Sequence, residues 1–219
     1  MAPWPIFGAV RTLLLLSLLS LQYALHAQHG PRVGFGLATR GPGVFGGSKA
    51  DMMPAPLFGW HLEARLHDQV SFMPEALWMT KGSYVRNPAL RASTIFTMRY
   101  IEVPLLLKIS TDRKPNGIFL LAGPGIGWFL QGREQRYLNG EKNYDEPIKL
   151  ADNERRSQFS VTLGFGFEGR RFAFDARGQS STGLFDAIVR PQNQVYALTV
   201  AYRFNNPVPE PPATEEESQ

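Results

Sequence analysis

The sequence predicts an all-β fold, an eight-stranded antiparallel up-and-down β-barrel of the transmembrane kind. Three observations predict it. Apolar and polar residues alternate with a period of two in eight separate segments, as side chains do along a strand. The connections between these segments are short and long in turn. The apolar faces are also too bulky to fill the inside of so narrow a barrel.

The eight alternating segments occupy residues 28–204, where no convincing helical period is present. They cover residues 32–39, 57–66, 70–80, 100–110, 118–131, 159–168, 172–177 and 195–204. The clearest is FSVTLGFGFE at 159–168, in which phenylalanine, valine and leucine alternate with serine, threonine and glycine. The chain's 21 glycines and 17 prolines suit many strands and turns better than a helical bundle.

The connections follow a strict order. HDQ, TDRKPNG and GR join segments two to three, four to five and six to seven, whereas the other connections are polar stretches of roughly 15 to 27 residues. Bacterial outer-membrane barrels have short periplasmic turns and long outer loops. We therefore expect the cell outer membrane as the location, with both ends of the barrel on the periplasmic side.

Side-chain volume indicates which face meets lipid. A lipocalin-like soluble barrel has the same alternation with its apolar face inward, but an eight-stranded lumen is only just wide enough for small side chains. The opposite faces carry small residues that fit inside: Gly34, Gly36, Gly59, Gly123, Gly125, Gly127, Gly164 and Gly166. The phenylalanines, tryptophans and aliphatic residues are therefore expected to face lipid.

Aromatic residues at the segment ends predict two girdles at the membrane interfaces. The outer girdle is predicted to contain Trp60, Trp78, Trp128, Phe159 and Tyr196. The periplasmic girdle is predicted to contain Phe167, Phe172, Tyr202 and Phe204.

The inward faces also carry polar and charged residues, which should pair because isolated charges in a narrow lumen are costly. The predicted lumen network comprises His61, Glu63, Arg65, Glu75, Tyr100, Glu102, Lys108, Glu168, Asp175, Arg177 and Arg203. We expect it to close the lumen to solutes. The alternative is a narrow polar conduit for small solutes or ions, or a ligand-sensing lumen.

A basic patch is predicted on the outer loop KGSYVRNPALRASTIFT at 81–97, which carries Lys81, Arg86 and Arg91 and no acidic residue. Arginine and lysine favour phosphate, so the loop could contact lipopolysaccharide. A merely solvated loop is the equally weighted alternative. The predicted partners are thus outer membrane lipids and lipopolysaccharide, and envelope or secretion proteins, with no role for nucleic acid.

The two ends of the chain are predicted to lie outside the barrel. Arg11 followed by the apolar run Leu13 to Leu25 has the length of a signal-peptide core, so residues 1–27 are predicted to be removed after Ala27. An uncleaved anchor is the alternative, since Leu25 is an unusual residue three positions before cleavage. Residues 205–219, rich in proline and glutamate, are predicted to form a disordered periplasmic tail, and a tail that reaches periplasmic partners is the alternative. The barrel between them spans residues 28–204.

Composition and motifs argue against several classes of function. The chain has no cysteine, which excludes disulfides and thiolate metal sites, and no other metal-ligand or cofactor motif is present. A lipid-modifying enzyme would need an activated nucleophile, and His61 with Ser71 or Ser160 is the conceivable combination. A lone inward histidine is more often part of a polar network, so we predict that the chain is not an enzyme.

Several motifs resemble a known family. PEALWMTKG, RYIEVPLLLKI, FLLAGPGIGWFL and LTVAYRF are similar to the PorT-like outer-membrane β-barrel proteins of Bacteroidetes-type bacteria, over roughly residues 31–204. Glu75 after Pro74, and Pro104 in the fourth segment, are the most distinctive positions. The resemblance implies the fold and the location. It also implies a structural or accessory role in an envelope or secretion assembly, because the family's namesake is linked to secretion.

Three prolines, Pro74, Pro104 and Pro124, fall in adjacent predicted strands. Proline cannot donate a hydrogen bond to the ladder, so we expect bulges there that bend the wall.

Overall fold

The computed structural model describes residues 27–40, 49–112, 117–149, 156–183 and 193–204. Over these residues the strands are β1 Gln28–Arg40, β2 Lys49–Asp51, β3 Met53–His67, β4 Val70–Asn87, β5 Ala92–Ser110, β6 Gly117–Leu138, β7 Glu141–Pro147, β8 Ser157–Glu168, β9 Phe172–Gly183 and β10 Asn193–Tyr202. Within that part of the chain, no helix is long and apolar enough to cross a membrane. The predicted signal peptide, except Ala27, and the predicted tail lie outside the described residues.

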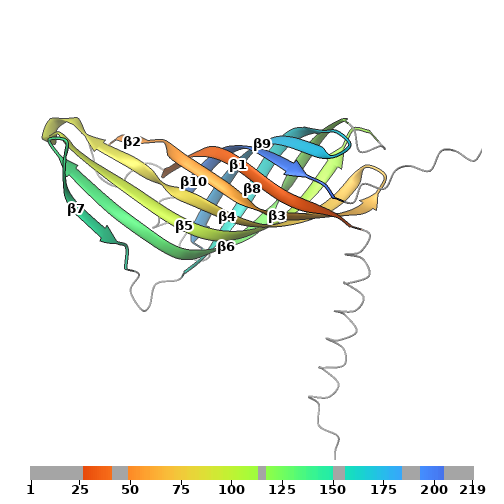
Figure 1. Cartoon of the computed structure of the whole chain (residues 1–219), viewed down its shortest axis with the longest axis horizontal. Helices are drawn as coiled ribbons and strands as arrows, with labels where there is room; N and C mark the ends of the chain where they lie inside the picture. Colours follow the sequence, from red (N-terminus) through yellow and green to blue (C-terminus); the bar gives the residue numbers. More distant parts are fainter. Residues whose placement is uncertain (1–26, 41–48, 113–116, 150–155, 184–192, 205–219) are drawn as a thin grey trace, which may run out of the picture.

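Eight of the strands close into an antiparallel ring, and the predicted fold is confirmed (Figure 1). The ring runs β4-β3-β1-β10-β9-β8-β6-β5, and β5 pairs back with β4. The first and last strands meet, with Arg32 of β1 opposite Ala201 of β10. The backbone N–H of Phe204 then donates to the His29 carbonyl at 2.8 Å, which ties the end of the barrel to its start.

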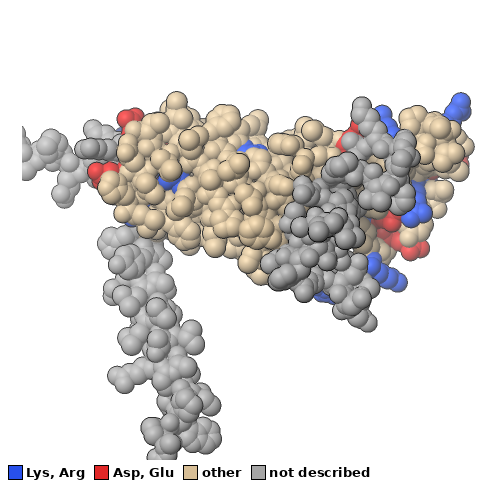
Figure 2. Space-filling view, turned by 180° about the vertical axis from the view of Figure 1, so that it is seen from behind, with Lys and Arg blue, Asp and Glu red and all other residues tan. Residues whose placement is uncertain are grey.

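The wall of the barrel has apolar side chains outside and polar side chains inside, as the sequence predicts. Large apolar side chains stand exposed on the outer face, among them Phe165 at 62% and Leu198 at 70%. In the space-filling view, most of the barrel wall carries no charged residue, whereas charged residues gather at the end from which β4, β5, β6 and β7 project (Figure 2). The residues buried inside include most of the charged side chains predicted to face the lumen.

The strands continue far beyond the wall on one side, so the predicted loop at 81–97 is wrong. β4 extends to Asn87 and β5 begins at Ala92, joined by a single turn of 3-10 helix at Pro88–Leu90. Asn87 Oδ1 accepts a hydrogen bond from the Leu90 N–H at 3.3 Å, and Arg91 closes the turn in the left-handed conformation at φ 48°. Alternating apolar residues are absent there because no lipid faces that part of the hairpin.

A second hairpin lies beside the first. β6 extends to Leu138 and turns back into β7 through Asn139 and Gly140, which have φ values of 53° and 88°. Two consecutive positive φ angles are typical of the tight type I′ turn, for which Asn-Gly is the favoured pair. Together with β2, the two hairpins form a projecting sheet of β2, β4, β5, β6 and β7 at the outer end of the barrel (Figure 1).

One aromatic residue was assigned to the wrong girdle. Trp60 stacks on His29 and Phe204, with ring centroids 5.9 and 5.8 Å apart, at the end where the chain enters and leaves the barrel. Phe204 in turn packs on Tyr202, which packs on Phe172. The assignment to the outer girdle failed because β3 begins at Met53, earlier than the pattern predicted, so that Trp60 lies at its midpoint.

The expected bulges at the three prolines are not found. Strand register is the same on both sides of Pro74 in the β4–β5 pair, of Pro104 in the β5–β6 pair, and of Pro124 in the β6–β8 pair. Register shifts lie instead at Arg65/His67, at Arg99/Tyr100 and at Arg136/Tyr137. Proline removes a hydrogen-bond donor from the ladder but adds no residue to the strand, so it interrupts pairing without moving the register.

Candidate functional site

The structure buries ten of the eleven residues predicted to line the lumen. They are His61, Glu63, Glu75, Tyr100, Glu102, Lys108, Glu168, Asp175, Arg177 and Arg203. Arg65 is the exception: it shares the inward face of β3 and lies opposite Ser71, but it is exposed because it lies at the rim of the barrel, next to the register shift before the turn to β4. Two further cations that the sequence analysis did not place in the lumen, Arg32 and Lys81, are also buried there.

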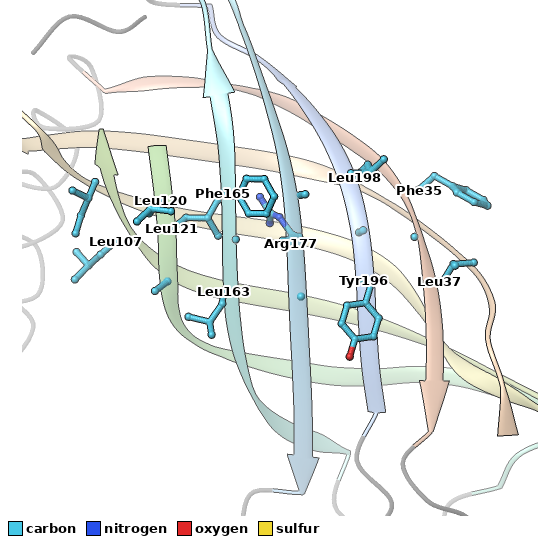
Figure 3. Close-up of a pocket in the computed structure, with 17 residues that line it drawn as sticks. Phe35, Leu37, Leu107, Leu120, Leu121, Leu163, Phe165, Arg177, Tyr196 and Leu198 are labelled. Carbon is cyan, nitrogen blue, oxygen red and sulfur yellow. The ribbon is translucent and has the colours of Figure 1, made fainter. Parts of the chain in front are cut away.

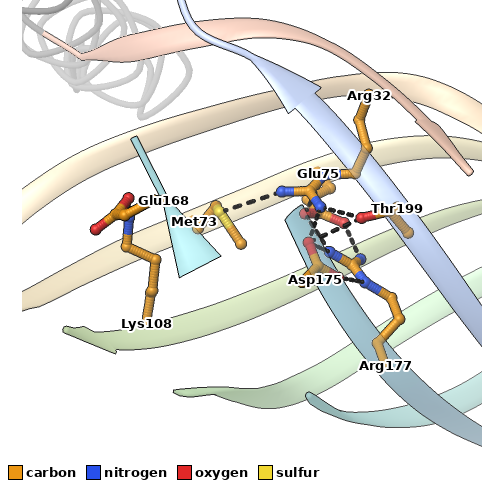
Figure 4. A network of polar contacts seen from close by, with 8 residues as sticks. All are labelled: Arg32, Met73, Glu75, Lys108, Glu168, Asp175, Arg177 and Thr199. Atoms are coloured by element: carbon orange, nitrogen blue, oxygen red, sulfur yellow. Dashed lines mark hydrogen bonds and ion pairs between the residues drawn. The ribbon is translucent and has the colours of Figure 1, made fainter. Parts of the chain in front are cut away.

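The central cluster comprises Arg32, Glu75, Asp175 and Arg177 from β1, β4 and β9 (Figure 4). Arg177 Nη1 lies 2.6 Å from Glu75 Oε2, and its Nε lies 2.7 Å from Asp175 Oδ1. Arg32 Nε lies 3.0 Å from Glu75 Oε1, and Arg32 also pairs with Asp175. Thr199 of β10 donates to Asp175 at 2.8 Å. Two cations and two carboxylates from three strands thus neutralise one another, and β10 adds the hydroxyl of Thr199.

A second cluster lies near the end where the chain enters and leaves the barrel, and is called the periplasmic cluster after the predicted orientation; it comprises Glu63, Lys108, Glu168 and Arg203. Lys108 Nζ and Arg203 Nη1 each lie 2.7 Å from Glu168 Oε2, and Lys108 also pairs with Glu63. This cluster again holds two cations and two carboxylates. Met73 lies between the two clusters (Figure 4) and belongs to an apolar layer with Leu106, Phe119, Leu121, Ala173 and Ala201.

The outer cluster has Lys81 and Glu102 at its centre, with Lys81 Nζ 2.5 Å from Glu102 Oε1. Glu102 also accepts hydrogen bonds at 2.7 to 3.1 Å from the side chains of Gln158, Ser160 and Gln179. Lys81 Nζ donates to Ser181 Oγ at 2.7 Å. The prediction that Lys81 belongs to a solvent-facing loop patch is therefore wrong, since its side chain is wholly buried.

Inward-facing glycines give these side chains their room. A Cβ on Gly127 would lie 2.0 Å from Glu102 Oε1, and one on Gly166 would lie 2.5 Å from the Phe119 ring. Neither contact is sterically possible. Each glycine therefore leaves the space that a Cβ would need to a side chain from a neighbouring strand. The predicted division between small inward residues and bulky outward ones is confirmed at these positions.

Little space is left between the clusters. The cavity lined by Leu57, Leu77, Pro104, Arg177 and Gln179, among others, has a volume of about 10 Å³. A single water needs roughly 10–15 Å³. In the outer half of the lumen an apolar layer packs beside the outer cluster; its buried members are Ala38, Met53, Ala55, Leu57, Met79, Met98, Tyr100, Val195 and Ala197. Phe129 and Ile148 pack against that layer.

The residues considered for catalysis are not brought into a catalytic arrangement. Ser160 Oγ donates to Glu102 at 3.1 Å, and Ser71 bonds to Glu63. His61 is held by the backbone of Gly30, and its Nδ1 has no hydrogen-bond partner among the described residues. In that part of the chain no group of three His, Asp or Glu side chains is placed to hold a metal ion.

The other two residues of the predicted basic patch are on the projecting sheet. Arg86 lies over the Tyr84 ring at 4.7 Å, and its Nε is 3.0 Å from Asp51 Oδ2. Arg91 is exposed at the tip of the β4–β5 hairpin. With Lys81 buried, the three residues do not form one surface.

A hollow also lies in the outer wall, over β9 (Figure 3). Ala176 and Gly178 form its floor, opposite Phe165 and Leu163 of β8 and Leu198 and Tyr196 of β10. The outward side chains that line it are apolar or aromatic, apart from the hydroxyl of Tyr196. Arg177 also borders the hollow, but its guanidinium pairs with Glu75 and Asp175 of the central cluster. The outward-facing lining thus continues the apolar wall.

Comparison with protein-family models agrees with this architecture. A family model described as an outer membrane protein β-barrel domain matches residues 25–189. Among solved structures, the chain is similar to Ail, the attachment invasion locus protein of Yersinia pestis, at 12% identity and a TM-score of 0.49, over 82% of this chain and 99% of that one. Neisserial surface protein A is similar at 12% identity and a TM-score of 0.47, over 80% and 97%. No curated protein in the comparison matches the chain.

Proposed function

The chain belongs to the outer-membrane β-barrel domain family, and from that membership we propose that it is a non-enzymatic barrel with a closed lumen, acting structurally or as an accessory to an envelope or secretion assembly. The family match spans most of the chain and identifies it as an outer-membrane protein. The finer role rests on what the lumen and the projecting sheet can do.

The observation that carries the proposal is the packing of the lumen. Five cations, Arg32, Lys81, Lys108, Arg177 and Arg203, are matched by five carboxylates, Glu63, Glu75, Glu102, Glu168 and Asp175. All ten are buried, and an apolar layer separates the periplasmic cluster from the central one. An ion crossing this lumen would have to separate ion pairs whose side chains are buried from solvent, which leaves unmatched buried charges.

Conductance tests the closed lumen. The full chain, folded into planar bilayers, is expected to give no stable current steps, while a heat-shift gel on the same preparation shows that the barrel is folded. Stable, sizeable conductance from folded protein would contradict the proposal and favour a narrow channel instead.

A non-enzymatic role is supported by the engagement of the candidate nucleophiles in the polar network, where Ser160 is bonded to Glu102 and Ser71 to Glu63. We expect no hydrolysis or acyl transfer when the folded barrel is incubated with phospholipid or lipopolysaccharide. Lipid turnover that is lost in His61→Ala would overturn this part of the proposal.

We further propose PorT-like membership, with lipopolysaccharide and envelope or secretion proteins as partners. The motifs around Pro74–Glu75 and Pro104 support the PorT-like membership, and Glu75 bridges Arg32 and Arg177 at the centre of the lumen.

Mild crosslinking in the native membrane followed by co-purification tests the proposed protein partners. The projecting sheet is the proposed docking surface, so a variant with shortened β4–β5 and β6–β7 hairpins should lose these proteins. Recovery of the same envelope proteins from that variant would contradict this surface.

A further inference from the structure

We propose that the outward face of β5 and β6, just beyond the lipid-facing band, binds a phosphate group of an outer-leaflet glycolipid through Arg99 and Arg133. The inference deepens the proposed contact with lipopolysaccharide by giving it a site, and it does not depend on whether the lumen is closed. Neither arginine belongs to the loop patch that the sequence predicted.

The position of Arg99 along β5 puts it at the outer membrane interface. Counting from the periplasmic end at Ser110, outward side chains Ile109, Leu107, Leu105 and Ile101 are exposed and apolar. A membrane-spanning β-strand needs about 9–11 residues, which from Ser110 ends near Ile101. Arg99 is the next outward residue, and so lies at headgroup level.

An aromatic ring holds Arg99 in this position. Its guanidinium lies 5.7 Å from the centroid of the Trp78 ring on β4, an exposed cation–π contact. Indole rings favour the membrane interface, so Trp78 supports Arg99 where lipid phosphates lie. No acidic side chain pairs with Arg99 among the described residues, which leaves its donors available to an anion.

Arg133 lies on the same face of the neighbouring strand. Arg99 is opposite Gln131 and Thr97 is opposite Arg133, so the two arginines are diagonal neighbours. Such positions are about 7–8 Å apart in a sheet, within reach of long side chains. The Arg133 side chain is 61% exposed, and its Nε lies 3.3 Å from Asp145 Oδ1. That exposed pair is weak enough for a phosphate to compete with the carboxylate.

The chemistry of the two side chains favours phosphate. A guanidinium presents N–H donors in a planar fork that matches phosphate oxygens, and two forks can converge on one phosphate. Tyr84, Ile95 and Tyr137 line a hollow of about 490 Å³ that also includes Met52, Pro54 and Gly140. Ile95 and Thr97 share the face of Arg99 on β5, and Tyr137 is opposite Ser93, so this hollow lies on the same face farther from the membrane. There it could contact the sugars attached to a phosphorylated lipid.

A lipid is favoured over a soluble anion because the site is continuous with the membrane-facing wall. Ile101 is the next outward residue of β5 on the membrane side of Arg99, and it lies opposite Trp128 of β6; both side chains are exposed. A lipid headgroup brings its phosphate to this height while its acyl chains cover that wall, whereas a free phosphate gains nothing from it.

Binding of lipid A to the full-length barrel tests the site. The barrel is folded into phosphatidylcholine vesicles containing increasing mole fractions of diphosphorylated lipid A or of the same lipid with its phosphates removed. Fluorescence of the tryptophans, with Trp78→Phe to identify the signal at the site, reports binding. The wild type is expected to reach half-saturation at a mole fraction about five- to tenfold lower than Arg99→Gln does, and Arg99→Gln/Arg133→Gln should lose the preference for the phosphorylated lipid.

Arg136→Gln is the matched control. Arg136 is exposed on β6, the strand of Arg133, but on the opposite face of the sheet, where it pairs with Glu134 at 2.6 Å. Its replacement should therefore leave lipid binding unchanged within about twofold. Equal binding of the two lipids, or of wild type and Arg99→Gln, would overturn the proposal. Full competition by millimolar inorganic phosphate would also overturn it, in favour of a soluble anion. None of these results bears on conductance or on protein partners, so the site can fail while the proposed function holds.

Discussion

The lumen and the projecting sheet contain ion pairs of the same type, a lysine with a carboxylate, but the pairs in the lumen are buried and those on the sheet are exposed to solvent. In the lumen Lys81 and Glu102 lie 2.5 Å apart with both side chains wholly buried. On the projecting sheet Lys142 and Asp145 lie 2.6 Å apart, with the lysine side chain 46% exposed. The distances are nearly equal, but water competes with the second pair and is excluded from the first.

The difference teaches that geometry alone does not set the energy of a pair. An exposed pair contributes about 0–1 kcal/mol, because water solvates either partner when they separate. Removing one partner of a buried pair leaves an unmatched charge and costs about 3–5 kcal/mol. The lumen should therefore behave as one unit, in which each charge requires the others, while the projecting sheet can change residue by residue.

The largest effect is expected on breaking the outer cluster. Glu102→Leu leaves Lys81 buried without its carboxylate and deprives Gln158, Ser160 and Gln179 of their acceptor. We expect the free energy of unfolding to fall by about 3–5 kcal/mol. Urea unfolding in lipid vesicles, followed by the gel shift between folded and unfolded barrel, measures it.

Lys81→Met on top of Glu102→Leu separates charge from packing. Because replacing both partners by apolar groups removes the unmatched charge, the double variant should regain a large part of the lost stability. A double variant no more stable than Glu102→Leu would show that the lumen depends on the individual hydrogen bonds and not on charge balance.

A smaller effect is expected on removing the space that holds the cluster. Gly127→Ala places a Cβ at 2.0 Å from Glu102 Oε1, so the carboxylate must move away from its donors. Overpacking of this kind costs about 1–3 kcal/mol, measurable by the same unfolding titration. Gly178→Ala is the matched control, because its Cβ would meet only the Tyr196 ring at 3.6 Å on the outer wall, and it should change stability by less than about 0.5 kcal/mol. Equal losses in the two variants would mean that Glu102 is not confined by Gly127.

The smallest effect is expected on the projecting sheet, as a dependence on pH. Hydrogen bonds from Lys142 and then Gln135 lower the pKa of Asp145. A carboxyl group with a lowered pKa stabilises the fold above the ordinary aspartate pKa of about 3.9 and loses that contribution as the pH falls further. The protection of amides in β6 and β7, taken relative to their intrinsic exchange rate at each pH, should therefore fall below about pH 4, while the barrel strands stay protected. Asp145→Asn should remove the pH step; a step that persists would assign the titration to another group.

The fold could be read from the sequence because lipid imposes alternation on every strand it touches. Phe159 to Glu168 shows this most clearly, and its outward residues are those exposed in the structure. Where lipid ends, so does the signal: residues 79–83 are all buried and follow no period of two, which is why Lys81 was assigned to a loop. The projecting sheet could not be predicted by periodicity for the same reason.

Two local signals in the sequence do indicate features of the structure that the period-two segments leave out. Val33, Phe35 and Leu37 face outward, so Arg32 must face inward with Gly34 and Gly36 by alternation alone. Asn139-Gly140 is a strong hairpin signal in its own right, and it marks the turn between β6 and β7. The partners within the lumen are a different matter. Arg177 meets Glu75, 102 residues away in the sequence, and that pairing depends on how far the closed strands are staggered.

The seam between β1 and β10 links the electrostatics of the barrel to its assembly. Arg32 on β1 reaches across the seam to Asp175 on β9 and Thr199 on β10, while its other carboxylate partner, Glu75, lies on β4. Before the first and last strands meet, Arg32 is separated from two of these three partners. Pairing of β1 with β10 therefore closes the barrel and neutralises Arg32 in the same step. A sheet that enters the bilayer before this pairing still carries the unpaired charge of Arg32 and of its carboxylate partner on β9.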